Sequence, residues 1–327
     1  MSKLIKITHL TSAHPRYDTR IFIKECCSLT KIEEYQVSLI VADGLGDEEK
    51  NGVAIYDIGQ LEGRLNRIFK TTKKMLKRAI ELDSDIYHLH DPELMPIGLK
   101  LKKLGKKVIF DAHEDLPKQV MAKHYLHSFV KKVLSASISI VETFISKRVD
   151  YVVAATPLIK DKFVAKQIQS IAINNFPILD ELIVIEPTFK TNTLCYIGLL
   201  YETRGVKEIV QAIEGLDVKL IIAGKFFDKN FEEEIQGLAG WKQVDFRGFV
   251  DREGVKKILE ESIAGLVTLH PTPSYVEAYP VKMFEYMSAG IAVISSNFPL
   301  YKSFVEKSQC GLCIDPLNVE EIRKAMI

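Results

Sequence analysis

The sequence predicts an α/β protein with two Rossmann-like domains, each a doubly wound parallel sheet, facing each other across a cleft. Three observations lead to this prediction. Short β-branched runs alternate with stretches of helical spacing, which is typical of parallel sheets covered by helices on both faces. The alternation occurs twice, on either side of residues 177–191, which contain two prolines and no clear period. The length of 327 residues corresponds to about two domains.

The predicted strands follow one another in chain order. Those of residues 1–176 are IKITHL, QVSLIVA, AIYDI, DIYHLH, KVIFDA, YVVAA and IAINN. Those of residues 192–327 are TLCYIG, VKLIIAG, VDFRG, AGLVTLH, IAVISS and GLCID. Ligands of such sheets bind beyond the carboxyl ends of the strands. Polar residues at these ends are therefore the first candidates for a functional site.

Composition restricts the class of protein. The formal net charge is +1, but the first half of the chain is basic and the second half acidic, which indicates two domains with different partners. No apolar run is long enough for a transmembrane helix, and MSKLIKITHL reads as a first strand rather than a secretion signal. Five scattered cysteines suit a reducing compartment. We therefore expect a cytoplasmic protein.

The stretch EAYPVKMFEYMSAG (277–290) combines two glutamates with a lysine. Pro280 suits the first position of a helix, and this helix would end before the strand IAVISS. Its N-terminus would offer backbone N–H groups and a partial positive charge close to Glu277 and Lys282, which suits a phosphate. The simpler interpretation is a surface Lys282–Glu285 pair worth ~0.2–0.5 kcal/mol.

Four segments carry a resemblance to a known family. They are HPRYDTRIFIKE (14–25), YHLHDPELMPIGLKLKKLGKKVIFDAHE (87–114), YIGLLYETRGVKEIVQAIE (196–214) and PVKMFEYMSAGIAVISSNFP (280–299). Together with the E-x7-E spacing, they resemble bacterial retaining glycosyltransferases of the family-4 (group 1) type, in the same order and over essentially the whole chain. The resemblance implies the GT-B fold, with an acceptor domain (1–176), a linker (177–191) and a nucleotide-sugar donor domain (192–327) that lacks the usual final helix.

The resemblance also implies roles for residues of the second half. Glu285 would bind the ribose hydroxyls and Glu277 the hydroxyls of the donor sugar, since charge-assisted hydrogen bonds are roughly twice as strong as neutral ones. Backbone groups before and at the start of the helix would hold the diphosphate. The donor-binding residues apart from the two glutamates are Ala278, Tyr279, Val281 and Gly198.

A basic residue is expected to neutralise the departing diphosphate. Arg204 matches the basic residue that relatives carry just before a glycine, although it could also be a solvated cation at the start of a helix. Many relatives have arginine where this chain has Leu199. We expect Lys282 to supply the missing charge. The expected catalytic residues are thus His113, Glu277, Arg204 and Lys282.

Two clusters, HLHD (88–91) and DAHED (111–115), lie at strand ends of the first half and would meet if their strands are neighbours. Histidine and carboxylate ligands suit zinc or iron, so a metal site must be considered. The resemblance instead places His113 beside the donor sugar and implies transfer without a metal. We therefore expect neither a metal nor another cofactor.

The loop TSAHPRYDTR (11–20) follows the first strand and contains no G-x-G-x-x-G, which disfavours hydride transfer with a nicotinamide. The resemblance implies that this loop lines the acceptor site. The residues expected on the acceptor side are His14, Asp18, Arg20 and Asp91. The simpler interpretation of Arg20 and of Lys24 is charge on a helix surface. For Lys24 that interpretation is preferred.

Two basic segments combine cations with apolar residues at helical spacing, in residues 64–78 and 123–132. Basic amphipathic helices bind anionic membranes, where each cation adds ~1 kcal/mol. The alternative is an ordinary amphipathic helix that covers the sheet. Nucleic acid is not expected as a partner, since the second half is acidic and the basic segments contain few aromatic residues.

These expectations describe a hexosyltransferase-type glycosyltransferase of bacterial polysaccharide synthesis, for lipopolysaccharide or capsule. It would move a sugar from a UDP- or GDP-linked donor to a glycan or polyprenyl-linked acceptor, with retention, at the inner face of the cell membrane. Two alternatives stay open: a sugar-nucleotide epimerase of the same fold, and a catalytically silent scaffold subunit that binds nucleotide or lipid.

Overall fold

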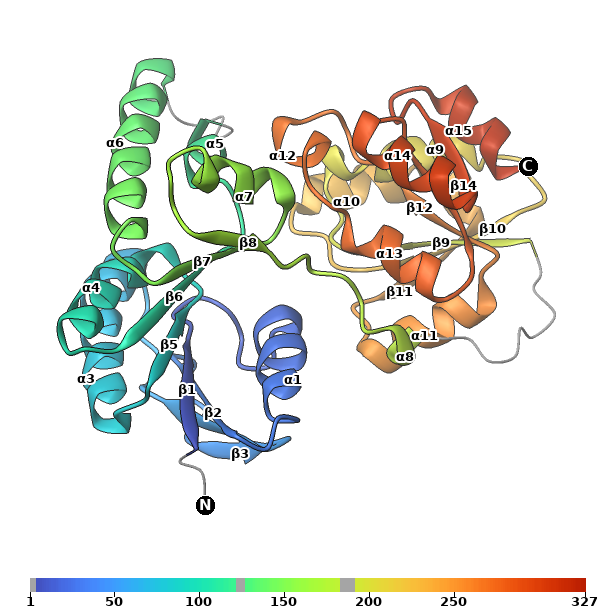
Figure 1. Cartoon of the computed structure of the whole chain (residues 1–327). Coiled ribbons are helices and arrows are strands. Elements are labelled where there is room, and N and C mark those ends of the chain that lie inside the picture. The colour runs from blue at the N-terminus through green and yellow to red at the C-terminus, as the bar shows by residue number, and fades with distance from the viewer. Residues whose placement is uncertain (1–3, 122–126, 183–191) are drawn as a thin grey trace. The chain divides into compact units, whose positions relative to one another are not determined.

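The computed structural model describes residues 4–121, 127–182 and 192–327, and the chain divides into two compact units, 1–175 and 176–327 (Figure 1). Each unit has one sheet with helices on both faces, so the predicted pair of α/β domains is confirmed. Within the predicted linker, residues 183–191 lie outside the described residues. The short helix α8 (Leu179–Leu182) precedes them, and its Leu182 is buried in the core of the second unit.

The sheet of the first unit has eight strands in the order β3-β4-β2-β1-β5-β6-β7-β8. Their bounds are β1 Ile5–Leu10, β2 Tyr35–Val41, β3 Glu48–Lys50, β4 Val53–Asp57, β5 Ile86–Leu89, β6 Lys107–Ala112, β7 Tyr151–Ala154 and β8 Ser170–Ala172. All recorded pairings are parallel except that of β3, which forms an antiparallel hairpin with β4. The sequence did not predict β3, because EEK is short and charged; charged residues are typical of an exposed sheet edge.

Helices cover both faces of this sheet. Their bounds are η1 Thr19–Cys26, α1 Cys27–Leu29, α2 Arg64–Asn66, η2 Arg67–Thr71, α3 Thr72–Leu82, η3 Pro92–Leu94, α4 Met95–Lys103, α5 Leu116–Met121, α6 Ser128–Ser146 and α7 Pro157–Val164. Neighbouring residues of β2 point to opposite faces: Ile40 packs in the cluster with α3, α4, α6 and α7, and Leu39 packs with η1. Within the described residues, no helix is both long and apolar enough to cross a membrane.

The sheet of the second unit has six strands, all parallel, in the order β11-β10-β9-β12-β13-β14. Their bounds are β9 Thr193–Ile197, β10 Lys219–Ala223, β11 Val244–Gly248, β12 Ala264–Val267, β13 Ala292–Ser296 and β14 Gly311–Ile314. The helices after α8 are η4 Glu202–Arg204, α9 Val206–Ala212, α10 Lys229–Gln236, η5 Ala239–Gln243, α11 Arg252–Glu261, α12 Pro273–Val276, α13 Val281–Ser288, α14 Pro299–Ser308 and α15 Val319–Met326.

Close packing against the sheet positions α13, the helix of the 277–290 stretch. A Cβ atom on Gly265 of β12 would lie only 2.2 Å from Cδ2 of Tyr286. The Tyr286 hydroxyl in turn accepts a hydrogen bond from the backbone N–H of Ile197, at 3.1 Å. The helix begins at Val281, directly after Pro280, so the predicted first position of Pro280 is wrong by one residue.

Substitution of Gly265 by alanine tests this contact. We expect Gly265→Ala to destabilise the second unit by about 1–3 kcal/mol, because overpacking must displace the Tyr286 ring. The measurement is the thermal unfolding midpoint. Gly237→Ala is the matched control, since its added Cβ would have contacts no closer than 3.4 Å. An unchanged midpoint for Gly265→Ala would show that α13 is not held by this contact.

Candidate functional site

The predicted meeting of the two histidine-containing clusters at one edge of the first sheet is observed, because β5 and β6 are paired neighbours. His90 Nδ1 lies 3.4 Å from His113 Nε2 and 3.5 Å from Asp111 Oδ2. His113 Nε2 lies 3.3 Å from the same Asp111 oxygen. Among the described residues, two groups are spaced for metal ligation: His90 with Asp111 and His113, and a deeper group that also includes His90.

Asp111 is the buried acceptor of this edge. Arg20 donates to it from Nε at 3.0 Å and from Nη2 at 2.9 Å, and donates from Nη1 to the Ile173 carbonyl at 2.9 Å. Burial opposes ionisation of Asp111, but hydrogen bonds from His113 and His90 and the charge of Arg20 outweigh it and hold the pKa well below its usual range. The guanidinium of Arg20 thus ties η1 to β6.

Burial of Arg20 contradicts its simpler interpretation as a helix-surface charge. Lys24 also contradicts its preferred interpretation as a helix-surface charge. Its ammonium donates a hydrogen bond to Asn175 Oδ1 at 2.7 Å and is partly buried. Asp18 accepts hydrogen bonds from the first amides of η1 and so fixes the start of that helix. The sequence had no signal for the contacts of Arg20 and Lys24, since their partners are up to 153 positions away.

Asp91 shapes the loop that follows β1. It accepts hydrogen bonds from the Thr11 hydroxyl at 2.9 Å and from the Ser12 amide at 2.5 Å. His14 lies above it, with Nε2 3.5 Å from Asp91 Oδ1 and Nδ1 3.5 Å from Asp18 Oδ2. The hydrogen bond to Asp18 is the main cause that raises the pKa of His14. The His14 and His113 ring centroids are 5.1 Å apart, so the structure brings these predicted residues together.

A cavity of about 620 Å³ with mixed polar and apolar lining opens beside His14, lined by residues that follow β1, β2 and β4. Its charged and polar lining includes Asp43, Gln60, Glu62 and Arg67. The sequence analysis missed these residues, although their position just after QVSLIVA and AIYDI was the available signal. Concave sites at the carboxyl ends of parallel strands commonly bind ligands.

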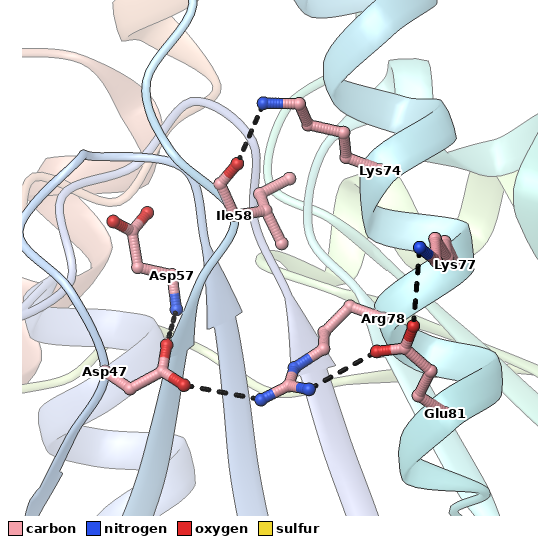
Figure 2. A pocket seen from close by; sticks show the side chains of 7 residues that line it. All are labelled: Asp47, Asp57, Ile58, Lys74, Lys77, Arg78 and Glu81. Atoms are coloured by element: carbon pink, nitrogen blue, oxygen red, sulfur yellow. Dashed lines mark hydrogen bonds and ion pairs between the residues drawn. The ribbon is translucent and has the colours of Figure 1, made fainter.

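A second cavity, of about 390 Å³, lies along the basic segment 64–78. Figure 2 shows that its cations are partnered: Arg78 contacts Asp47 and Glu81, Lys77 contacts Glu81, and Lys74 donates to the Ile58 carbonyl. This part of the segment is therefore an ion-paired surface rather than an uncompensated basic one.

In the second unit, Lys282 is the most unusual of the predicted residues. Its side chain is buried, its Nζ has no hydrogen-bond partner within the described parts of the chain, and it lies 3.7 Å from the centroid of the Tyr196 ring. A Cβ on Gly198 would be only 3.0 Å from this Nζ, so glycine leaves room for the ammonium beside the backbone. Burial and then the charge of Arg204 lower the pKa of Lys282 well below its usual range.

Arg204 stands at the end of η4, next to the end of β12. Its guanidinium carbon lies 4.9 Å from the centroid of the Tyr275 ring, and its Nε is buried without a hydrogen-bond partner among the described residues. The following Gly205 has φ +73, and a Cβ there would lie 2.0 Å from the Thr268 carbonyl oxygen. Nearby, His270 Nε2 lies 3.2 Å from Glu208 Oε2, a pair that the sequence analysis did not identify.

Glu285 is paired with an arginine that the sequence analysis missed. Arg252 Nη1 donates to Glu285 Oε1 at 2.7 Å, and the same guanidinium donates to both oxygens of Glu181 at 2.7 and 2.9 Å. The simpler interpretation of a surface Lys282–Glu285 pair is wrong, because Lys282 is buried. No sequence signal linked Arg252 to Glu285, since they belong to different helices, α11 and α13.

The segment before α13 differs in part from the expectation. Glu277 is exposed at the end of α12. The Ala278 amide, predicted to face a diphosphate, donates instead to the Tyr275 carbonyl at 3.3 Å. The Tyr279 ring packs against other aromatic rings, and its centroid lies 6.1 Å from the centroid of the Phe284 ring. Val281 opens α13. Among the first amides of this helix, that of Met283 donates to the Pro280 carbonyl at 2.9 Å, whereas the amides of the first two positions point out of the helix end.

Two family models match the chain. The model for glycosyl transferases group 1 matches residues 183–327, and the model for glycosyltransferase family 4 matches residues 26–174. The chain belongs to the group 1 glycosyltransferases. It is a glycosyltransferase by family, and the resemblance noted in its sequence is confirmed. The comparison with curated proteins gave no match.

Solved structures share the GT-B fold of this glycosyltransferase. Sucrose-phosphate synthase from Thermosynechococcus elongatus is 15% identical with a TM-score of 0.74, covering 98% of this chain and 88% of that one. Anabaena HepE in complex with UDP and glucose is 14% identical with a TM-score of 0.71, covering 98% and 89%. The lipopolysaccharide outer core galactosyltransferase WaaB is 17% identical with a TM-score of 0.62, also covering 98% and 89%.

The titration of His14 tests the geometry of the first-unit site. We expect the pKa of His14 to lie above the ordinary value of about 6.5 and to fall towards it in Asp18→Asn, because the hydrogen bond to the carboxylate is lost. Since the folded-state pKa is raised, the stabilisation by His14 is present below the ordinary pKa and is lost as the pH rises through the folded value. NMR titration of the imidazole measures this.

The control for this titration is Asp161→Asn, which removes an exposed carboxylate that is paired with Lys160. It should leave the His14 titration unchanged. If His14 of the unsubstituted protein titrated at or below the ordinary value, the pairing with Asp18 and Asp91 would be wrong.

Proposed function

We propose that this glycosyltransferase moves a sugar from a UDP- or GDP-linked donor to a glycan or polyprenyl-linked acceptor, with retention of anomeric configuration. The observation that carries the proposal is the buried Lys282 side chain, whose Nζ has no hydrogen-bond partner among the described residues and whose pKa is lowered by burial and then by the charge of Arg204. Two nearby cations in a buried site disfavour each other's charge. A diphosphate would compensate both, as the perturbed groups of functional sites commonly require.

The donor is assigned to the second unit. The first amides of α13 and its positive helix end favour a phosphate, next to Lys282 and the glycine at position 198. Glu285, oriented by Arg252, would accept hydrogen bonds from the ribose hydroxyls, since a carboxylate has acceptor sites on both oxygens. Glu277 would bind the donor sugar. Structures of Anabaena HepE with UDP and with UDP-glucose support a nucleotide-sugar donor.

The acceptor is assigned to the first unit, at the cavity beside His14. In the proposed step the acceptor oxygen bonds to the anomeric carbon of the donor sugar, and the bond from that carbon to the diphosphate oxygen breaks. The acceptor proton passes to the departing diphosphate on the same face. Arg204 and Lys282 would stabilise the charge that develops, which is commonly the largest contribution to such barriers. These cations take the place of a metal at the diphosphate, and His113 would contact a hydroxyl of the donor sugar.

Substitution of the buried lysine tests the donor site. We expect Lys282→Met to lower turnover by about 10²–10³-fold, the usual effect of removing one group that stabilises developing charge. It should also remove the thermal shift produced by the preferred nucleotide. Turnover is measured by product analysis with UDP-, GDP- and ADP-linked sugars, and a nucleotide at 100 times its Kd should stabilise the unsubstituted protein by about 2.7 kcal/mol.

The control is Lys229→Met on α10, because that lysine is exposed and lies outside the site. Equal turnover of Lys282→Met and the control would refute the assigned diphosphate site. Interconversion of two nucleotide sugars without an acceptor would instead identify an epimerase. Neither transfer nor slow donor hydrolysis with any donor would favour the silent scaffold.

A peripheral membrane position is proposed through α6. Large apolar side chains are exposed along its whole length: Phe129, Val130, Val133, Leu134, Ile140, Val141 and Phe144. Lys131 and Lys132 lie on the same helix, and Lys147 and Arg148 follow it. In Figure 1, much of α6 extends beyond the strands of its own sheet. An exposed apolar helix face flanked by cations is typical of binding to an anionic membrane surface. Residues 123–126 of the predicted segment 123–132 lie outside the described residues.

Vesicle binding tests this surface. We expect Ile140→Ser and Phe129→Ser each to weaken co-sedimentation with anionic vesicles by about tenfold, corresponding to partial burial of one large apolar side chain. Phe249→Ser is the matched control, since Phe249 is 84% exposed and belongs to the second unit. Absence of binding by the unsubstituted protein at low salt would refute the proposed surface.

A further inference from the structure

Beneath the loop that carries His14, three imidazoles and one carboxylate converge in the interior of the first unit. His9 lies in β1 and is paired in register with His88 of β5. His90 is two positions further along, so it points to the same face of the sheet. That face is covered by η1, which contributes Glu25. The side chains of the three histidines are buried and that of Glu25 is 15% exposed.

The facing atoms of this His9–Glu25–His88–His90 cluster are close together. Glu25 Oε2 lies 3.9 Å from His9 Nδ1, 3.8 Å from His88 Nδ1 and 3.8 Å from His90 Nε2. His9 Nδ1 and His90 Nε2 are 2.9 Å apart, and all four ligand atoms lie within 4.8 Å of one another. Ligand atoms of a tetrahedral zinc site with bonds of about 2.0–2.1 Å are roughly 3.3 Å apart. The four distances given differ from this spacing by about 0.4–0.6 Å, and no pair of ligand atoms exceeds it by more than about 1.5 Å. Small side-chain movements would therefore close the cluster around one ion.

The cluster also contains buried polar atoms that the described residues do not satisfy. Neither oxygen of Glu25 has a hydrogen-bond partner among the described residues, although Oε1 forms an ion pair with Arg20 Nε at 3.1 Å. The ion-pair partners of Oε2 within 4.0 Å are the three imidazole nitrogens. Burial and then the charge of the neighbouring Asp111 carboxylate raise the pKa of Glu25. A buried carboxylate oxygen without a hydrogen bond is costly, and a cation at the centre of the cluster would remove this cost.

We propose that His9, Glu25, His88 and His90 bind one divalent first-row transition-metal ion, with zinc the best fit. Imidazole nitrogen suits zinc, copper, iron and nickel, and a set of three imidazoles with one carboxylate completes tetrahedral zinc without a solvent ligand. Such a closed site is structural rather than catalytic. The ion takes the place of the proton between His9 Nδ1 and His90 Nε2.

Contacts around the cluster support this assignment over the alternative group His90–Asp111–His113. Asp111 Oδ2 lies 3.5 Å from His90 Nδ1, the position of the second-shell carboxylate that orients a metal-bound histidine. Both Asp111 oxygens already accept hydrogen bonds from Arg20, which makes Asp111 a poorer direct ligand. The ion would join β1, β5 and η1 and thereby fix the loop that holds His14. The proposal of this metal site does not depend on the proposed transfer reaction or on the diphosphate site.

The experiment uses the full chain, stripped of metal by dialysis against a chelator and titrated with Co²⁺ as a spectroscopic probe and then with Zn²⁺. We expect one Co²⁺ per chain, visible absorption bands typical of tetrahedral Co²⁺, displacement by Zn²⁺ and a higher thermal midpoint with either ion. Absence of stoichiometric binding, or only octahedral bands, would overturn the proposal.

Two variants decide which group holds the ion. Glu25→Gln, which keeps the size of the side chain, should weaken Co²⁺ binding by at least about 100-fold, since loss of even a second-shell group costs 10–100-fold. His113→Gln should keep the one-to-one stoichiometry and the tetrahedral bands. The reverse pattern would assign the ion to the alternative group and overturn the proposal.

Folding of the variants is checked by circular dichroism. If Glu25→Gln does not fold, His9→Gln replaces it with the same expected loss. Retention of the tetrahedral bands in a folded variant of either ligand would also overturn the proposal.

Discussion

Parallel pairing of β1 with β5 and of β5 with β6 is the constraint on which the polar centre of the first unit depends. It places the carboxyl ends of three strands at one edge, so side chains from the two histidine-containing clusters meet the loop after β1. The bidentate contact between Arg20 and Asp111 then fixes η1 over this edge. Breaking a buried ion pair of this kind by removing one partner typically costs 3–5 kcal/mol.

The two units differ in how a buried cationic side chain is compensated by its partners. In the first unit the Arg20 guanidinium is matched by Asp111, which is the arrangement expected of a structural ion pair. In the second unit the Lys282 ammonium has no hydrogen-bond partner among the described residues, and burial lowers its pKa. Of the charges that act on it, that of Arg204 has the largest effect and lowers the pKa further, and the Glu285 carboxylate offsets this only in part. Uncompensated burial of this kind is unfavourable without a ligand, and it therefore indicates a binding site more strongly than the presence of a lysine does.

Some residues of the second unit are assigned a contact with the donor, whereas others only orient those residues, through hydrogen bonds or packing. Arg252 holds Glu285 and Glu181 together, so it sets the direction of the carboxylate that we assign to the ribose. Tyr286 fills the place left by the side chain that Gly265 lacks, and thereby sets the depth of α13 on the sheet. Neither residue is assigned a contact with substrate, yet both determine where the assigned groups of α13 lie.

The sequence by itself determined the α/β class, the two successive sheets, the predicted strands, and the helix that carries Lys282 and Glu285. These features depend on local periodicity, which reports how a segment alternates between buried and exposed faces. The sequence also indicated that His90 and His113 would meet if their strands were neighbours, because the carboxyl ends of neighbouring parallel strands lie at one edge of a sheet. The hairpin strand β3 was not predicted, because it is short and charged and, at the edge of the sheet, pairs only with β4 among the described strands.

Only the tertiary structure decided which distant residues face each other. Periodicity cannot tell that Lys282 is buried against Tyr196, that Arg252 pairs with Glu285, or that Arg20 is interior rather than exposed. It also cannot bring His9 and Glu25 to the histidines of β5, since those contacts depend on strand register and on the packing of η1. Long-range contacts of this kind are set by how whole elements pack, and no short stretch of sequence contains that information.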